Sequence, residues 1–197
     1  YDALGQYQDA IAEYKEALRI DPGITLARNY LDELEKNKPQ SDKEFKKEVI
    51  DNVLYGILGA NADRFLNSGQ YKSAIDALKA RIRSEPDEAD DHHRLGVAYH
   101  NLNQYEDAIA SYKEAIRIRP GDAAMQSSLG FTFLVLNRYQ EAITLFKEAL
   151  GIDPNFTKAH YGLGVIYGKM DRNDDAIAFF KKAIIKKPDY VDAHEDL

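Results

Sequence analysis

Four prolines recur at a constant interval in the second half of the sequence. Pro86, Pro120, Pro154 and Pro188 each follow the one before by 34 residues. A period of roughly 20 to 50 residues indicates one supersecondary unit that is stacked on copies of itself. This period constrains the fold more than any other feature, because every unit must bury its apolar face against its neighbours.

Each copy of the repeat contains two stretches with apolar residues three and four positions apart, which predicts two amphipathic helices. The first stretch has a leucine, a glycine and, one turn later, an aromatic residue, and the second has an aromatic residue between two alanines. Large residues opposite small ones allow facing helices to pack closely. These positions are Leu95, Leu129 and Leu163; Gly96, Gly130 and Gly164; Tyr99, Phe133 and Tyr167; Ala108, Ala142 and Ala176; Tyr112, Phe146 and Phe180; and Ala115, Ala149 and Ala183.

This pattern of Leu-Gly, aromatic residue, alanine, aromatic residue, alanine and proline is similar to the tetratricopeptide repeat family, of bacterial or archaeal type. The resemblance is strong over 87–188 and poor over 25–54. It implies an all-α fold, namely a right-handed superhelical solenoid of antiparallel helix pairs whose first helices line a concave groove. The sequence departs from the family pattern at His92, Gln126 and His160, where a large residue is usual, at Arg81, where alanine is usual, and at Asn173, where the other units have tyrosine.

The repeat divides the chain into segments of unequal regularity. In chain order, we expect a partial unit at 1–22 that is mostly a second helix, an irregular helical segment with the start of a long helix at 25–54, a degenerate unit at 55–86, units at 89–122, 123–156 and 157–188, and the start of a further helix at 189–197. The long helix keeps its helical spacing to about Asn67, and Tyr71 to Ser84 complete the degenerate unit.

Composition limits the classes of function. The net charge of −7 argues against nucleic acid as a partner, and the absence of cysteine excludes disulfides, thiolate nucleophiles and cysteine-based zinc sites. No apolar run approaches the ~20 residues that a membrane-spanning helix needs. The first residues show no signal-peptide pattern, which predicts a cytoplasmic protein unless a targeting segment lies upstream.

Glycines and histidines suggest two further sites that the repeat pattern argues against. Gly162, Gly164 and Gly168 approximate a dinucleotide-binding motif, but that motif follows a strand, whereas this stretch is predicted to be helical. Gly162 and Gly168 have no packing role in the repeat and would leave a thin stretch of groove wall for a ligand. His93 and His100 are seven residues apart, about 10 Å along a helix, which is too far to share an ion.

His92, His160 and His194 occupy one repeat position, which we expect to point into the helix pair. We therefore predict no metal, no cofactor and no catalytic residue. An acidic cluster precedes one helix and a basic cluster ends another, as the helix macrodipole favours, and a charged docking patch is the alternative explanation. These clusters are Asp87, Glu88, Asp90 and Asp91, and Lys181, Lys182, Lys186 and Lys187.

A candidate groove emerges when the core positions are subtracted from the first helices. The remaining apolar and polar residues face away from the second helix, and packing on the neighbouring repeat is the alternative for each of them. An apolar strip with a polar rim suits a peptide or a partner helix. The predicted groove residues are His93, Val97, Asn101, Ser127, Phe131, Leu134, Tyr161, Val165 and Lys169.

Family members that grip a C-terminal carboxylate place lysine, asparagine and arginine on successive first helices. At the matching positions this chain has Val97, Ala124 and Phe131, so the resemblance favours apolar recognition. We expect a non-catalytic module that binds a protein or peptide, mainly through apolar contacts. The alternatives are a scaffold that self-associates through exposed terminal helices, and the recognition arm of a larger enzyme such as a glycosyltransferase.

Overall fold

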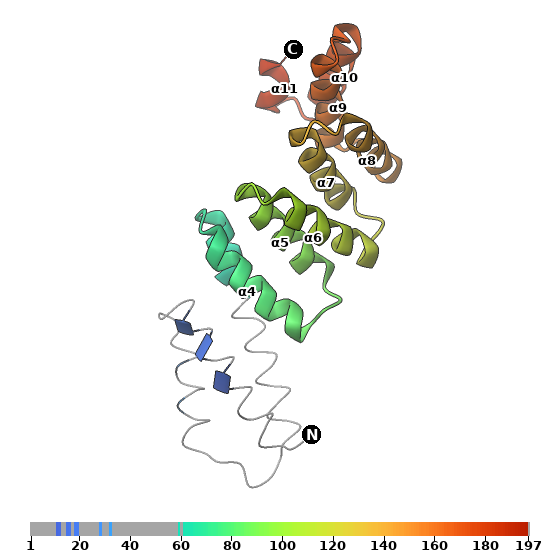
Figure 1. Cartoon of the computed structure of the whole chain (residues 1–197). Helices are drawn as coiled ribbons and strands as arrows, with labels where there is room; N and C mark the ends of the chain where they lie inside the picture. Colours follow the sequence, from blue (N-terminus) through green and yellow to red (C-terminus); the bar gives the residue numbers. More distant parts are fainter. Residues whose placement is uncertain are drawn as a thin grey trace. The chain divides into compact units, whose positions relative to one another are not determined.

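A computed structural model describes residues 11–12, 15–16, 18–19, 28, 32, 59 and 61–196. The chain divides into two compact units, Tyr1–Leu102 and Asn103–Leu197 (Figure 1). This division falls inside the segment 89–122, which the sequence predicts as one repeat. Most of the partial unit at 1–22, the irregular segment at 25–54 and the start of the degenerate unit lie outside the described residues.

All regular elements of the described residues are helices, which confirms the all-α fold class. Unit 1 contains a helical stretch that ends at Asn67, as predicted, followed by α4 (Tyr71–Ser84) and α5 (Ala89–Asn101). Unit 2 contains α6 (Tyr105–Ile118), α7 (Ala123–Val135), α8 (Tyr139–Ile152), α9 (Thr157–Lys169), α10 (Asn173–Lys186) and α11 (Val191–Glu195). No helix in this part of the chain is long and apolar enough to cross a membrane.

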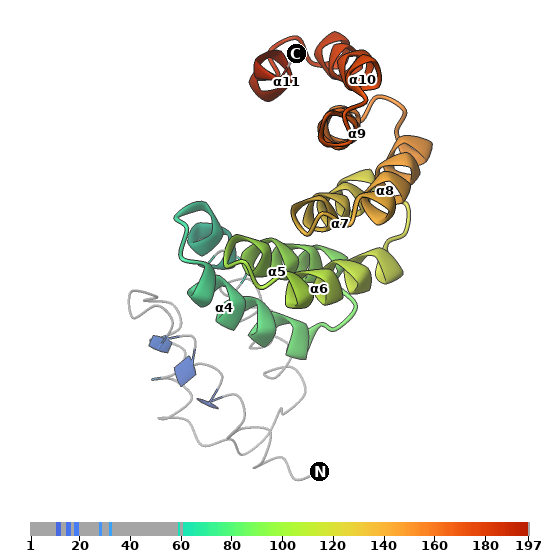
Figure 2. The ribbon, with the colours of Figure 1, turned by 45° about the horizontal axis from the view of Figure 1, so that its top comes forward.

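The helices of unit 2 pack as consecutive neighbours. The short links from α7 to α8 and from α9 to α10 force each pair to run antiparallel. Figure 2 shows α9 and α10 side by side, and α11 packs against this pair. Helix α7 contacts α6, α8 and α9, so the pairs stack directly on one another, as in a solenoid.

The turns between paired helices share one backbone feature. Asn103, Asn137 and Asp171 have φ near +58°, in the left-handed region that asparagine and aspartate tolerate better than most residues. The hydroxyl groups of Tyr105 and Tyr139 donate to Oδ1 of Asn103 and Asn137, at 2.7 and 2.8 Å. In the last turn, Asp171 takes the left-handed position and Asn173 replaces the tyrosine, a departure that nothing in the structure explains.

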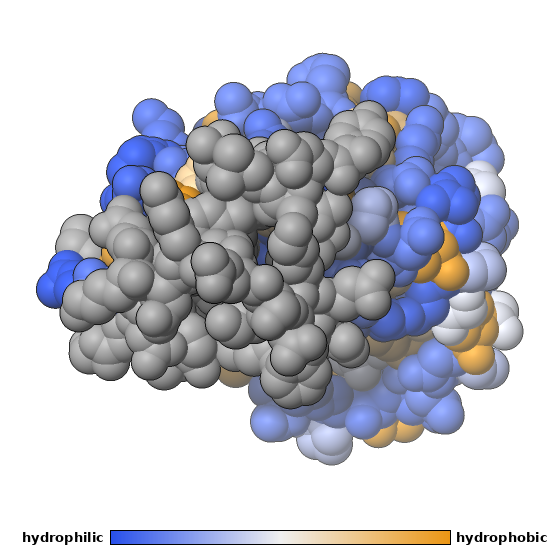
Figure 3. Space-filling model, turned by 90° about the horizontal axis from the view of Figure 1, so that it is seen from below, coloured by the Kyte–Doolittle hydropathy of each residue, from blue (hydrophilic) through white to orange (hydrophobic). Residues whose placement is uncertain are grey.

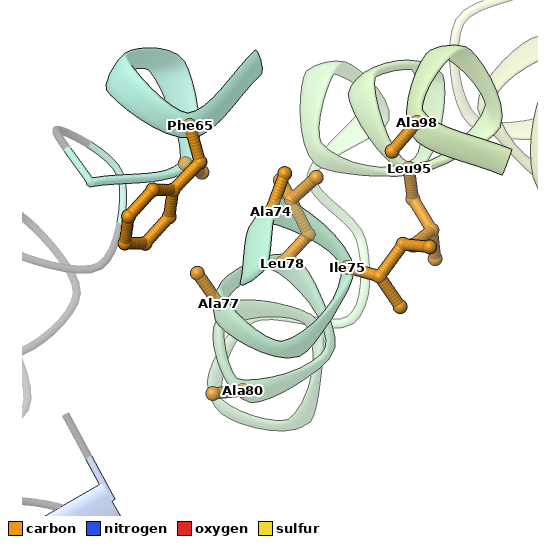
Figure 4. Packing of buried hydrophobic residues seen from close by; sticks show 9 residues of the cluster. Phe65, Ala74, Ile75, Ala77, Leu78, Ala80, Leu95 and Ala98 are labelled. Carbon is orange, nitrogen blue, oxygen red and sulfur yellow. The ribbon is translucent and has the colours of Figure 1, made fainter. Parts of the chain in front are cut away.

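The core of unit 1 is built around α4. Figure 4 shows Leu78 and Ala74 of α4 between Phe65 on one side and Leu95 and Ala98 of α5 on the other. All five side chains are buried. The small residues let the helices approach, while the leucines and the phenylalanine fill the space between them.

A buried ion pair joins α4 to α5. Nε of Arg81 donates to Oδ2 of Asp91 at 2.8 Å, and the two side chains are 8% and 0% exposed. A Cβ atom on Gly59 would lie 1.9 Å from Nη1 of Arg81, so the glycine provides space for the guanidinium group. Arg81 therefore departs from the alanine of the other units because Asp91 and Gly59 together accommodate it.

Glycines in unit 2 accommodate aromatic rings of the second helices. The ring of Phe146 is fully buried, and a Cβ atom on Gly130 or Gly162 would lie 2.9 or 2.4 Å from it. The expectation that Gly162 thins a groove wall is therefore wrong, since it packs against Phe146. A Cβ atom on Gly168 would contact only Cβ of Ala176, at 3.9 Å.

The histidines of one repeat position bind the turn that precedes their own helix. Nε2 of His92, His160 and His194 donates to the carbonyl oxygen of the proline six residues earlier, at 2.8, 3.0 and 2.8 Å. The ring of His160 also lies 6.1 Å from that of Phe179 on α10, and its side chain is buried, so this histidine points into the helix pair as predicted. All three histidines in addition link the turns between repeats to the first turns of α5, α9 and α11.

Candidate functional site

The predicted groove residues fall into two sets because the chain forms two units. His93, Val97 and Asn101 lie on α5 in unit 1, where His93 and Val97 are partly exposed and Asn101 is exposed. Nδ2 of Asn101 donates to the carbonyl oxygen of Val97 at 2.8 Å. The other six residues lie on α7 and α9 in unit 2.

Two predicted residues of unit 2 are inaccessible. Ser127 is 2% exposed and Leu134 is 7% exposed, so neither can contact a ligand in this conformation. For these two residues, packing within the unit is the correct interpretation, and the prediction that they line a groove is wrong. The period of the sequence identified their helix face but not the depth at which neighbouring helices cover it.

Phe131, Tyr161 and Val165 remain partly exposed, and Lys169 is exposed. The ring centroid of Phe131 lies 5.0 Å from that of Phe146 in an edge-on arrangement and 6.4 Å from that of Tyr161. Such edge-to-face and tilted pairs stabilise aromatic clusters beyond the area that they bury. Phe131, Tyr161 and Val165 therefore form the outer layer of an apolar cluster. Its inner layer is the core of unit 2.

Tyr190 and Asp196 extend this cluster, and sequence reasoning missed both. The ring of Tyr190 meets Tyr161 edge-on at 5.4 Å between centroids. The hydroxyl group of Tyr161 donates to Oδ2 of Asp196 at 2.9 Å. The position of Tyr190 directly before α11 was a usable signal, because Phe156 occupies the equivalent position before α9.

Burial, followed by the hydrogen bond to Asp196 and the charge of that carboxylate, raises the pKa of Tyr161. Burial, followed by the charge of Asp192, also raises the pKa of Tyr190. Both hydroxyl groups therefore stay protonated at neutral pH and act as neutral hydrogen-bonding groups. The cluster offers a ligand apolar and aromatic contacts without a charged nucleophile.

An ion pair marks the corresponding surface of unit 1. Nε of Arg94 lies 3.2 Å from Oδ1 of Asp63, and both side chains are partly exposed. Asp63 occupies the repeat position that is Val97, Phe131 and Val165 in later copies. The first helices thus present charged groups in unit 1 and aromatic groups in unit 2.

The structure indicates no metal site in the part of the chain that it describes. Within it, no three His, Asp or Glu side chains are placed to hold a metal ion. The face in Figure 3 is mainly hydrophilic where it is not grey, with small and separate hydrophobic patches.

Stacked antiparallel helix pairs with a repeating core define a helical-repeat protein of the protein-interaction class. Profiles described as tetratricopeptide repeat match residues 1–24, 89–122 and 136–197, together more than half of the chain. The chain belongs to the tetratricopeptide repeat family. A comparison with curated proteins finds no match.

Solved structures share this fold. The crystal structure of MamA has a TM-score of 0.64 and 21% identity, over 95% of this chain and 92% of that one. The crystal structure of YrrB, described as a tetratricopeptide repeat protein with an unusual peptide-binding site, has a TM-score of 0.63 and 21% identity, over 96% of both chains. The first repeat domain of Spaghetti (RPAP3), bound to an HSP90 peptide, has a TM-score of 0.53 and 17% identity, over 55% of this chain and 86% of that one. At these identities, the likeness shows the fold alone.

Proposed function

We propose that this chain is a non-catalytic interaction module and that the first helices of unit 2 bind an apolar peptide segment or partner helix. The observation that carries the proposal is the partial exposure of Phe131, Tyr161 and Val165. The buried positions of the repeat already form the core, so the core does not explain why these three positions are apolar. Apolar side chains that are left accessible on one helix face are what an amphipathic or extended partner contacts.

The position of these residues in the repeat supports a linear partner. Phe131 and Val165 occupy the same repeat position on α7 and α9, so their side chains repeat at the spacing of successive first helices. Val135, one turn after Phe131, is 48% exposed, and Lys169 follows Val165 by one turn. We expect a partner to place apolar residues over Phe131 and Val165 and polar residues near Lys169.

The charges of the first helices also support apolar recognition. A site that grips a peptide carboxylate needs cationic or amide donors, but Ala124 and Phe131 stand at two of the positions where the family places them. The RPAP3 structure holds a bound HSP90 peptide, and YrrB is described as having an unusual peptide-binding site, so two proteins of this fold bind peptides. We extend the proposal to His93, Val97 and Asn101 as a separate, more polar contact set on α5.

The test uses Val165→Asp, because Phe131 meets the fully buried ring of Phe146. Val165 also packs against the core of α10 and α11, so the folding of this variant must be measured as well. Peptides selected by the wild-type chain from a random phage-displayed library should be enriched in apolar residues. A charge placed in the apolar site should weaken their binding by at least about tenfold, measured by fluorescence anisotropy. Ile152→Asp, an exposed isoleucine at the end of α8, is the matched control and should leave binding unchanged.

The proposal fails if Val165→Asp retains full affinity for the selected peptides. It also fails if those peptides carry no excess of apolar residues over the starting library. A thermal melt followed by circular dichroism must show that Val165→Asp remains folded, so that lost binding reports the surface and not unfolding.

A further inference from the structure

The outer face of α10 combines an exposed isoleucine with lysines. Ala176, Phe180 and Ala183 form the buried stripe of this helix. At 100° per residue, Ala178 and Ile185 lie on the opposite side, and both are exposed. Ile185 is 73% exposed, more than any other large hydrophobic residue in the described part of the chain.

Lysines lie close to Ile185. Lys181 and Lys182 precede it by four and three residues and therefore neighbour it on the helix surface, and Lys186 follows it at the end of α10. Lys187, the C-cap residue, points elsewhere, since its Nζ lies 6.0 Å from the ring centroid of Tyr190. None of the four forms an ion pair with a carboxylate of the described residues. Nζ of Lys182 lies 4.7 Å from the ring centroid of Phe179, which holds the stem of this lysine against the helix surface.

The other second helices of unit 2 share only part of this charge. The position of Lys181 is lysine in all three helices, but Glu114 of α6 and Glu148 of α8 occupy the position of Lys182, and isoleucine occupies the position of Lys186 in both. All three helices have the same length and the same macrodipole, so the dipole does not account for Lys182 and Lys186, which occur on α10 alone. Both side chains are exposed, so packing of the core does not account for them either.

We propose that this face of α10 binds an acidic amphipathic helix of a partner protein. Lys181, Lys182 and Lys186, which have no described carboxylate partner, supply the charge complementarity, and Ile185 beside Lys181 and Lys182 supplies one apolar contact at the centre. Ala178, two turns before Ile185, is small and allows a partner helix to approach closely. The partner therefore carries one apolar residue flanked by glutamate or aspartate three and four positions away.

A phospholipid surface fits this face less well than a helix does. The chain carries a net charge of −7, and the exposed Asp174 lies on the same face of α10, one turn before Ala178. A planar anionic surface would contact the whole face, including Asp174. A single helix can contact the lysine end alone, and at physiological salt a Debye length of about 8 Å screens the more distant carboxylates.

The test uses a synthetic, fluorescein-labelled helical peptide of alanine and glutamate with one leucine, which is flanked by glutamates three and four residues away. A scrambled peptide has the same composition. The double substitution K182E/K186I copies the residues of α8 and should weaken binding of the designed peptide by at least about tenfold in fluorescence anisotropy. Ile185→Arg copies the residue of α6 and should also weaken binding, although it adds a positive charge.

Lys147→Glu reverses an exposed lysine of α8 at the position equivalent to Lys181 and should leave binding unchanged. Equal binding of the scrambled peptide, or full affinity after Ile185→Arg, would show unspecific charge attraction and overturn the proposal. Binding to vesicles of phosphatidylserine and phosphatidylcholine without binding to the peptide would overturn it in favour of a membrane. Val165→Asp should not change this binding, so the outcome is separable from the test of the proposed function.

Discussion

Gly162→Ala places one methyl group against the most confined ring of unit 2. In the middle of a helix, alanine is normally favoured over glycine by about 1 kcal/mol, so propensity alone predicts stabilisation. The added Cβ atom, however, would lie 2.4 Å from Cζ, 2.6 Å from Cε2 and 2.8 Å from Cε1 of Phe146. Atoms in folded proteins do not approach this closely, so the ring or the helix must move.

Phe146 has little freedom to move. Its side chain is fully buried, and Gly130 on α7 is also close, since a Cβ atom there would lie 2.9 Å from the same ring. Overpacking of a confined core typically costs about 1 to 3 kcal/mol, which equals or exceeds the gain in helix propensity. We therefore expect Gly162→Ala to lower the free energy of unfolding by up to about 2 kcal/mol.

Gly168→Ala is the matched control because it changes the same residue type in the same helix. The nearest neighbour of its added Cβ atom would be Cβ of Ala176, at an ordinary contact distance of 3.9 Å. The propensity gain should then dominate and raise the free energy of unfolding by up to about 1 kcal/mol, somewhat less so near the end of α9. Urea unfolding followed by circular dichroism should thus show opposite signs for the two substitutions.

Phe146→Leu tests the cause, since it removes the atoms that the new methyl group would meet. In a double-mutant cycle, Gly162→Ala should cost less in the background of Phe146→Leu than in the wild-type chain. If the two substitutions are additive, or if Gly162→Ala stabilises the chain as Gly168→Ala does, the steric reasoning is refuted.

Two further predictions concern buried polar groups. Arg81→Ala should lower the free energy of unfolding in urea by about 3 to 5 kcal/mol, because it leaves the carboxylate of Asp91 buried without its principal partner. The double substitution R81A/D91M copies the next repeat and should recover much of this loss. Burial lowers the pKa of His160, so the unfolded chain binds a proton more readily, and stability should decline as pH falls below about 6.5, the ordinary histidine value. His160→Gln copies Gln126 and should reduce this decline in melting temperatures measured between about pH 7 and pH 5.

The period of the sequence predicted the helices well because it reports contacts that recur in every copy. The bounds of α4 and the helical end at Asn67 were both predicted in this way. The period could not predict contacts that occur once. Arg81 is buried only because Gly59, 22 residues away, and Asp91 have complementary size and charge. Gly162 was interpreted as part of a groove wall for the same reason, because its contact with Phe146 in another repeat is not visible in the period.

The candidate site was predicted to the level of helix faces but not of single side chains. Phe131, Tyr161 and Val165 are partly exposed on the predicted helices, whereas Ser127 and Leu134 on α7 are covered. Exposure at these positions depends on how closely the neighbouring helix packs, and that distance is determined by side-chain volumes in two different repeats. A helical wheel of one repeat shows the side chains of that repeat and not those of the neighbour that covers it.

Differences between copies therefore report function better than the shared pattern does. Asp63 and Arg94 occupy two repeat positions of the first helices and form an ion pair in unit 1. The equivalent positions in unit 2 are Phe131 and Gly162, where Phe146 fills the space beside the glycine and contacts Phe131 edge-on. Since the helix geometry is common to both copies, these two positions determine whether a first-helix surface is charged or aromatic. A partner that requires apolar contacts should thus prefer unit 2, and one that requires charged contacts should prefer unit 1.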